Sequence, residues 1–440
     1  MTLKLFIESY GCQMNVLDSE LIAGKMGTRG YELTDEQADA DVILFNTCSV
    51  REHAEDRALS NAGKLKKLKA KKPGVVIGIV GCMAQNRQEE LFKRLPHVQL
   101  VVGPRRLGAI PRLVEEIRKT GARRIATEDF DEEFIDGAET PAARSSPFQA
   151  YVKAMEGCDM SCTFCIVPTT RGAEVSRPAQ SIVDECRRLA DGGTVEVTLL
   201  GQTIDSYGKG LAPRIDLGGL LRRVHDEVPG LRRIRFITSH PSFVRDSLID
   251  ALAELPRVCK YLHMPAQSGS DRVLKAMRRG YTAAKYEETV AKLRAKVPGV
   301  EIASDWIVGF PGETAEEFEK SVGLMERVRF QNSFVFKYSP RPGTDAAALA
   351  DDVPEDEKRR RNQVLLDLQE RVSQEKNAAK VGSTAELFVE GPSKRDATRM
   401  TGRTETNQIV NFPAGRELSG RFATVRIVSS SGLAFVGDLI

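Results

Sequence analysis

The first part of the chain alternates short apolar runs with amphipathic segments. Apolar runs at residues 3–9, 41–46, 75–80 and 100–102 have the composition of buried strands. Helical patterns follow them at residues 18–26, in a long polar segment that ends at residue 72, at 88–94 and at 110–119. Such alternation is typical of a parallel sheet covered by helices. Residues 1–120 are therefore predicted to form an open parallel α/β sheet.

A second series of strand and helix patterns follows a turn-rich segment. Residues 121–147 are charged and rich in turn formers, which predicts a linker. Strand candidates then occur at residues 150–156, 195–200, 233–238, 261–264, 303–308 and 333–337, with helices between them. Six such units predict a partial (β/α) barrel over residues 148–376, with its chemistry in the loops that follow the strands.

The pattern changes once more near the end of the chain. After a charged helix over residues 352–379, five short strands are predicted at 384–389, 400–403, 408–412, 422–428 and 433–439. Short strands separated by Gly and Pro turns favour a small β-barrel, a shape that often binds oligonucleotides. Residues 377–440 are predicted to form this third domain.

Composition changes this picture little. The 440 residues are 41% hydrophobic and 28% charged, and the net charge of +3 does not by itself indicate a nucleic-acid partner. No apolar run is long enough to span a membrane, and the N-terminus lacks the layout of a secretory signal, so we expect a cytoplasmic protein without a membrane partner. Basic runs at residues 64–72 and 358–361 are either solvated helix faces or RNA contacts.

The eight cysteines favour metal ligation over disulfides in such a chain. Cys158, Cys162 and Cys165 lie in one short loop, with no nearby Cys or His to complete a set of four ligands. Three thiolates would leave one iron of a four-iron cluster open, and an open metal position indicates a reactive site. A zinc loop or three buried structural cysteines remain the alternatives.

Three further cysteines each follow a predicted strand of the first domain. Cys12, Cys48 and Cys82 come after its first, second and third strands. Loops beyond the carboxyl ends of parallel strands gather at one edge of the sheet. We therefore expect these three thiols to form a second tridentate site, although isolated burial would also explain each cysteine.

The assembled motifs resemble the methylthiotransferases of the radical S-adenosylmethionine (SAM) superfamily over nearly the whole chain. The resemblance depends on the spacing Cys-x3-Cys-x2-Cys, on the contexts of Cys12, Cys48 and Cys82, and on several further segments. These segments are residues 238–241, 267–270, 309–314, 338–344, 390–394 and 401–412, of which the last resembles the RNA-binding TRAM domain. The chain departs from the family at Thr203, where Asn is common, and at Thr169, where Tyr is frequent.

The resemblance implies two [4Fe-4S] clusters and a specific reaction. Cys158, Cys162 and Cys165 would hold a cluster whose open iron chelates SAM and cleaves it to a 5′-deoxyadenosyl radical. Cys12, Cys48 and Cys82 would hold an auxiliary cluster that supplies sulfur, with SAM also the methyl donor. The nearest members methylthiolate carbon 2 of N6-(dimethylallyl)adenosine at position 37 of the tRNA anticodon loop. Implied partners are that tRNA and an electron donor such as a flavodoxin or ferredoxin, and a monomer is expected.

Other residues are candidates for contacts in the barrel. Gln202, Ser239, Gln267 and Asp305 lie at strand ends and would contact SAM or the base; otherwise they are polar loop residues. Arg171 and Arg177 would pair with the SAM carboxylate, with an RNA phosphate, or with a surface acid. Cys186 and Cys259 are expected to be buried packing residues.

Two alternative functions remain open at this stage. A related methylthiotransferase would act on N6-threonylcarbamoyladenosine in tRNA or on an aspartate of a ribosomal protein. A protein of another class would use its clusters for RNA binding or electron transfer without catalysis. Perturbation of a cluster spectrum by SAM would separate the radical enzyme from the second alternative.

Overall fold

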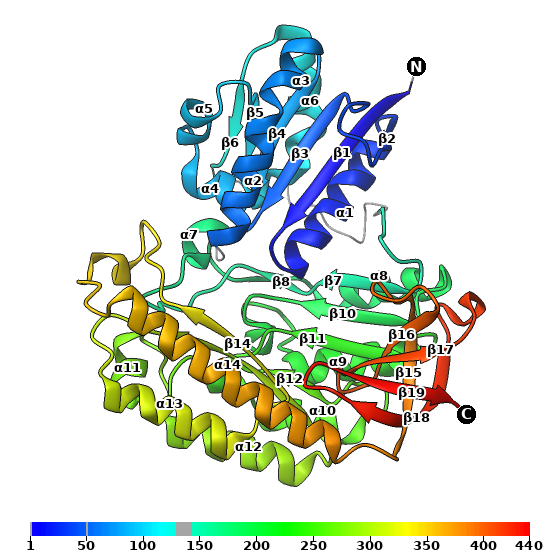
Figure 1. The fold of residues 1–440 in the computed structure, drawn as a ribbon. Helices are drawn as coiled ribbons and strands as arrows, with labels where there is room; N and C mark the ends of the chain where they lie inside the picture. Colours follow the sequence, from blue (N-terminus) through cyan, green and yellow to red (C-terminus); the bar gives the residue numbers. More distant parts are fainter. Residues whose placement is uncertain (1, 50–51, 129–142) are drawn as a thin grey trace.

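The computed structural model describes residues 2–49, 52–128 and 143–440. Three units follow one another along the chain, with the first above the second and the third beside the second in Figure 1. Most of the segment predicted as a linker, residues 129–142, lies outside the described residues. No described helix is long and apolar enough to cross a membrane.

The first unit is a six-stranded parallel sheet in the order β2-β1-β3-β4-β5-β6. Its central strands are buried throughout because helices cover both faces, and a separate hydrophobic core fills each side. The strands are β1 (Leu3–Tyr10), β2 (Tyr31–Leu33), β3 (Val42–Thr47), β4 (Val76–Gly81), β5 (Leu100–Val102) and β6 (Arg124–Ala126). The helices are α1 (Gln13–Gly27), α2 (Glu52–Lys64), α3 (Lys66–Lys71), α4 (Cys82–Arg87), α5 (Glu90–Arg94) and α6 (Ile110–Thr120).

The edge strands β2 and β6 were not predicted from the sequence. Each mixes polar and apolar residues over three positions and so lacks the apolar run by which the equally short β5 was predicted, and pairing with β1 or β5 supplies its hydrogen bonds. Strand β6 lies within the segment that was expected to be a linker. The helix predicted over residues 88–94 is α5, and the backbone of Gln88, with a φ of 43°, separates it from α4, which was not predicted.

The second unit is the predicted partial barrel of parallel strands. It consists of two three-stranded groups, β7-β10-β11 and β12-β13-β14, and β11 lies next to β12. Its six strands are β7 (Gln149–Lys153), β10 (Glu196–Leu200), β11 (Arg233–Ile237), β12 (Tyr261–His263), β13 (Glu301–Val308) and β14 (Asn332–Lys337). A two-residue pair, β8 (Met155–Glu156) and β9 (Val175–Ser176), brackets the cysteine loop.

Helices surround the outer face of the barrel. Val197, Ile234 and Trp306 point outward and pack with these helices in the largest core. The intervening strand residues, such as Asp305, therefore face the inside. The helices are α7 (Val167–Arg171), α8 (Ala179–Asp191), α9 (Leu217–Glu227), α10 (Asp246–Glu254), α11 (Asp271–Ala276), α12 (Ala283–Lys296), α13 (Ala315–Val328) and α14 (Glu355–Ala378).

The third unit is a closed five-stranded barrel, as predicted. Its strands follow the order β15-β16-β17-β19-β18, and each lies within two or three residues of its predicted bounds. They are β15 (Thr384–Pro392), β16 (Arg399–Arg403), β17 (Ile409–Pro413), β18 (Phe422–Ser430) and β19 (Ala434–Leu439).

Buried arginines attach this small barrel to the first residues of β11. Arg233 donates to the carbonyl oxygens of Arg403 (2.6 Å) and Glu386 (3.1 Å). Arg235 donates to those of Thr404 (2.8 Å) and Glu405 (3.0 Å). Charge-assisted bonds to main-chain oxygens hold the small barrel in a fixed orientation at the end of the barrel opposite the cysteine loop.

Candidate active site

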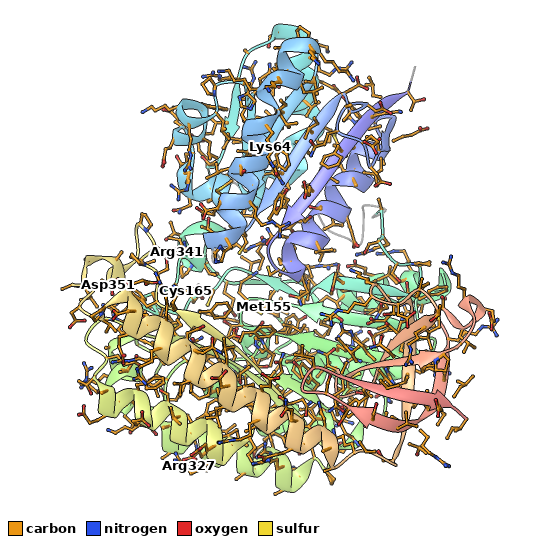
Figure 2. The ribbon with its side chains drawn as sticks, viewed as in Figure 1. Lys64, Met155, Cys165, Arg327, Arg341 and Asp351 are labelled. Carbon is orange, nitrogen blue, oxygen red and sulfur yellow. The ribbon has the colours of Figure 1, made fainter. Side chains whose placement is uncertain are left out.

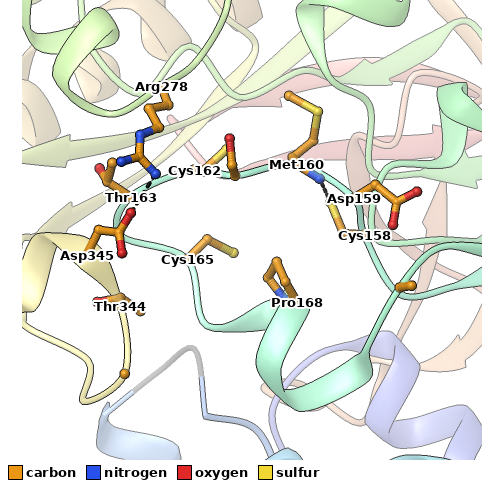
Figure 3. Close-up of a pocket in the computed structure, with 13 residues that line it drawn as sticks. Cys158, Asp159, Met160, Cys162, Thr163, Cys165, Pro168, Arg278, Thr344 and Asp345 are labelled. Carbon is orange, nitrogen blue, oxygen red and sulfur yellow. Dashed lines mark hydrogen bonds and ion pairs between the residues drawn. The ribbon is translucent and has the colours of Figure 1, made fainter.

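The loop after β8 brings three cysteines around one cavity. Cys158 and Cys162 are each 8% exposed, and Cys165 is partly exposed. The cavity has a volume of about 440 Å³, and its walls also include Pro168, Arg278 and residues 343–345. Figure 3 shows the three cysteines surrounding one open space at the top of α7. The prediction that they share a site is consistent with this arrangement, and the remaining room suits an object larger than one ion.

Two side chains that sequence reasoning did not assign contact these sulfur atoms. The Oγ1 atom of Thr203 lies 3.3 Å from the Sγ atom of Cys158. Buried Arg279 donates from Nη1 to the Sγ atom of Cys162 at 3.3 Å. Hydrogen bonds to sulfur ligands tune the reduction potential of iron–sulfur clusters. Thr203 had a signal in the sequence, since it stands where the family commonly has Asn.

Burial disfavours the thiolate form of Cys158 and Cys165 in this loop. Burial raises the pKa of Cys165 to about 12, and burial also raises the pKa of Cys158. A cysteine binds metal as the thiolate, so metal binding here would release protons. A bound cluster would therefore have to offset the burial of these thiols, with Arg279 as a cationic neighbour at Cys162.

The four residues predicted to contact SAM fall into two pairs. Among the described residues, the Oγ atom of Ser239 and the Oε1 atom of Gln267 are buried and have no hydrogen-bond partner. Such orphaned atoms are rare and indicate a missing partner. Gln202 instead accepts from the backbone N–H of Gly157 at 2.8 Å, and Asp305 accepts from the Nε2 atom of His263 at 3.0 Å in the tautomer protonated there. Ser239 and Gln267 thus fit a polar cofactor, whereas Gln202 supports the cysteine loop.

The second cysteine triad lies at the sheet edge where topology predicted it. Cys12 precedes α1, Cys48 follows β3, and Cys82 begins α4. Gly11 has no room for a side chain, because an added Cβ atom would lie 2.5 Å from that of Cys48. At Gly81 it would lie 2.3 Å from the Oδ1 atom of Asn46. These glycines let the strand ends approach each other.

The electrostatics of this triad differ from those of the first. A hydrogen bond from Cys48 lowers the pKa of Cys12 to about 6, despite burial and with help from Arg171. Burial raises the pKa of Cys82, although Arg171 acts against it. Among the described residues, the hydroxyls of Thr47 and Ser49 are buried beside Cys48 without a hydrogen-bond partner. Soft thiols with orphaned hydroxyls fit a sulfur-rich cluster.

The triads are more open than a site for one metal ion. In residues 2–49, 52–128 and 143–440, no three His, Cys, Asp or Glu side chains are close enough to hold a single ion. The remaining cysteines, Cys186 and Cys259, are buried as predicted and belong to neither triad.

Arg171 and Arg177 are buried rather than exposed, which corrects the expectation of a surface pair or RNA contact. Arg171 bonds Asp18 and Glu156, while Arg177 bonds Glu185 and the carbonyl oxygen of Lys153. The basic run 358–361 is divided: Lys358 and Arg361 are buried in ion pairs, whereas Arg359 and Arg360 are exposed and pair with acids of their own helix, as a solvated helix face would. Sequence charge alone could not locate these acids, which come from elsewhere in the chain or from the preceding helical turn.

The two cysteine sites face each other across a domain boundary. Helix α7 follows Cys165 directly and packs against α4, which begins at Cys82. Figure 2 shows Cys165 and Met155 where the first unit meets the barrel. A ligand at the first triad and one at the second would therefore be neighbours.

Comparison with known families assigns each unit of the chain. Residues 4–103 match a family described as "Uncharacterized protein family UPF0004", residues 152–325 the radical SAM superfamily, and residues 378–431 the TRAM domain. Among solved structures, the radical S-adenosylmethionine methyltransferase TsrM from Kitasatospora setae is similar, with a TM-score of 0.58 and 15% identity over 79% of this chain and 77% of that one. At that identity the likeness concerns the fold alone.

Full-length relatives are much more similar in sequence. A protein of Rhodopirellula baltica named tRNA-2-methylthio-N(6)-dimethylallyladenosine synthase is 45% identical over 460 aligned residues, covering 99% of this chain and 95% of the relative. A protein of the same name from an Acidovorax species is 46% identical, covering 100% of this chain and 98% of the relative.

Proposed function

Because the chain belongs to the tRNA-2-methylthio-N(6)-dimethylallyladenosine synthase family, we propose that it methylthiolates carbon 2 of N6-(dimethylallyl)adenosine at position 37 of tRNA. The observation that carries this proposal is that two separate cysteine triads face each other across a boundary between domains. One cluster would suffice for radical chemistry alone, whereas insertion of sulfur also needs a source of sulfur close to the reacting carbon.

The barrel residues would bind and orient the cofactor. Cys158, Cys162 and Cys165 would hold a [4Fe-4S] cluster with one open iron, and Ser239 and Gln267 offer unpaired polar atoms to SAM. When bound, SAM supplies the methyl group and, after reduction, the radical chemistry that opens an unactivated aromatic C–H bond. Gln202 would keep the cysteine loop in place through Gly157.

The second triad would hold the auxiliary [4Fe-4S] cluster. The lowered pKa of Cys12 favours its thiolate, which is the form that binds iron. The buried, unpaired hydroxyls of Thr47 and Ser49 flank Cys48 in the sequence and would donate to a sulfur atom carried on this cluster.

The inner face of the barrel supports an apolar modification on the substrate base. Val335 packs outward against the largest core, so its neighbours Phe334 and Phe336 project to the inner face of edge strand β14, where they are 44% and 37% exposed. Phe334 lies beside Asp305 in register, and the His263 ring meets it edge-on with centroids 6.2 Å apart. Exposed aromatic rings suit stacking with a base and contact with a dimethylallyl group. They offer no counter-charge to the carboxylate of threonylcarbamoyladenosine.

The remaining partners are proposed together with this function. The TRAM barrel would contact the anticodon arm from its fixed position, and the target base would leave its stack to enter the larger barrel. A flavodoxin or ferredoxin would supply electrons to a monomeric enzyme.

Mass spectrometry of tRNA nucleosides tests this function directly. In a strain that lacks this gene, dimethylallyladenosine should accumulate, and the methylthio form should return with the wild-type protein but not with Cys158→Ala. A Cys186→Ala protein is the matched control, because this buried cysteine belongs to neither triad, and it should restore the product. Unchanged dimethylallyl nucleosides, with loss of methylthio-threonylcarbamoyladenosine or of a methylthiolated ribosomal protein, would instead identify the alternative substrates.

A further inference from the structure

Arg171 lies at the centre of a buried charge network between the first two units. Its side chain is 3% exposed. Nη2 donates to the Oδ2 atom of Asp18 on α1, and Nη1 donates to the Oε1 atom of Glu156 on β8, both at 2.8 Å. The barrel domain thus supplies the arginine, and the N-terminal domain supplies one of its two carboxylates.

Lys153 completes this network and balances its charge. Its Nζ atom lies 3.3 Å from the Oδ1 atom of Asp18 and donates to the Oε2 atom of Glu156 at 3.0 Å. Two cations and two anions therefore cancel, and no side chain of the four is more than 5% exposed. Such charges are costly to bury unless every partner is in place, so removal of one member leaves an uncompensated charge.

The network lies against the auxiliary cysteine triad. Helix α7, which ends at Arg171, packs against α4, which begins at Cys82. The guanidinium of Arg171 accordingly opposes the rise that burial causes in the pKa of the Cys82 thiol. The same positive charge helps to lower the pKa of the Cys12 thiol. From the N-terminal domain, Arg105 donates to the carbonyl oxygens of Arg171 (2.8 Å) and Ala173 (2.5 Å), which fixes the backbone around this arginine.

We infer that Arg171 is a positioning residue that holds a permanent positive charge against the auxiliary cluster site from the neighbouring domain. The site is then electrostatically complete only when the two domains are docked. This inference rests on the proposed function, because it requires a cluster on Cys12, Cys48 and Cys82.

The chemistry of arginine explains why this residue suits the role. A guanidinium stays charged at every physiological pH and presents several donors in a fixed plane, so it can bond two carboxylates and still face a sulfur atom. Net charge nearby and hydrogen bonds to sulfur are two of the terms that set a cluster's reduction potential. Arg171 supplies both the charge and the hydrogen-bond donors. It lies six residues after Cys165, which belongs to the other triad.

The test measures the midpoint potential of the auxiliary cluster alone. The full chain carries Cys158→Ala, Cys162→Ala and Cys165→Ala, so that only the auxiliary triad can be reconstituted, and the potential is followed by electron paramagnetic resonance. Arg171→Met removes the positive charge, so the cluster should become harder to reduce and its midpoint should shift to more negative values. Asp18→Asn removes a negative charge, so the midpoint should shift in the opposite direction.

A matched control separates this effect from lost stability. Arg177 is similarly buried at 5% exposed, and it bonds Glu185 and the carbonyl oxygen of Lys153, both within the barrel domain. Arg177→Met should lower the melting temperature and leave the midpoint unchanged. If Arg171→Met does not fold, the sign of the shift in Asp18→Asn decides the question.

Each result has one meaning. Opposite shifts for Arg171→Met and Asp18→Asn support the inference, and so does the shift of Asp18→Asn alone where the other variant cannot be prepared. A bound cluster whose midpoint is unchanged in the variants would overturn the inference and leave the proposed function intact. A parent protein that binds no iron or sulfide on the auxiliary triad would overturn both.

Discussion

The two cysteine sites differ in how the fold assembles them. The barrel triad comes from one loop of eight residues and lines an open cavity, whereas the auxiliary triad joins three strand ends that are 36 and 34 residues apart. At the first site burial raises the pKa of Cys158 and Cys165, whereas at the second Cys48 and Arg171 lower the pKa of Cys12. An open cavity admits an exchangeable cofactor, while a site with fixed charges beside it suits a group that stays bound.

The same contrast extends to the carboxylates near each site. Asp18, beside the auxiliary triad, is fully buried, yet Arg171 and Lys153 outweigh the burial and lower its pKa. Asp205, in the loop after β10, is buried with only backbone N–H groups and distant arginines to offset this, so its pKa is raised to about 8. The buried carboxylate beside the auxiliary triad is thus paired with cations, whereas the buried carboxyl in the barrel is not.

The largest expected effect is a separation of two reactions by triad. Cys48→Ala should abolish formation of the methylthio nucleoside and retain cleavage of SAM, because only the sulfur source is lost. Cys162→Ala should abolish both, because the open iron is lost. Mass spectrometry of methylthio nucleoside and 5′-deoxyadenosine from the same reaction measures each step.

The control for that experiment is again Cys186→Ala, which should retain both reactions because Cys186 is buried on α8. Methylthio product from Cys48→Ala, or SAM cleavage by Cys162→Ala, would show that the roles assigned to the two triads are wrong.

A smaller effect should follow from loosening the barrel loop alone. Gln202→Leu removes the acceptor for the Gly157 N–H, so the rate of SAM cleavage should fall about tenfold, as is typical when an outer hydrogen bond to a metal site is lost. The spectrum of the auxiliary cluster should not change. Gln149→Leu is the control, because Gln149 also makes one side-chain bond, to Glu196, at the opposite end of the barrel. Equal rates for wild type and Gln202→Leu would contradict the supporting role.

The smallest effect concerns the pH dependence of stability. Because the folded chain keeps Asp205 protonated up to about pH 8, it binds more protons than the unfolded chain from about pH 4 upward, where a free carboxyl ionises. The raised pKa of Asp205 therefore makes the free energy of unfolding fall as pH rises from about 4 to 8. Asp205→Asn should flatten the decline of the melting temperature between pH 6 and 8.

The sign is opposite for Asp18, whose lowered pKa contributes stability above the unfolded pKa that is lost as pH falls through the folded value. Asp18→Asn should therefore lower the melting temperature at neutral pH, and this loss should shrink in acid.

A pH profile for Asp205→Asn that runs parallel to that of the wild type would show that Asp205 is ionised in the native state.

The sequence predicted most of the architecture because its patterns are local. Long apolar strands such as β3 and β4 and the five strands of the TRAM barrel are visible as hydrophobic runs between turn residues. The three-residue strands β2 and β6 are not, since their pairing with β1 and β5 stabilises them. Gln202 shows the same limit within the site, because its position after a strand could be read but its bond to Gly157 could not.

By itself, the sequence determined which residue types carry the chemistry and roughly where they lie. Spacing in one loop defined the barrel triad, and strand-end positions defined the auxiliary triad. Only the tertiary structure decided what surrounds them: Arg171 was expected at a cofactor, a phosphate or a surface acid, and it instead lies buried between Asp18 and Glu156. The physical reason is that Asp18 is 153 residues away from Arg171 in sequence, and no local pattern encodes a charge pair that forms only when two domains dock.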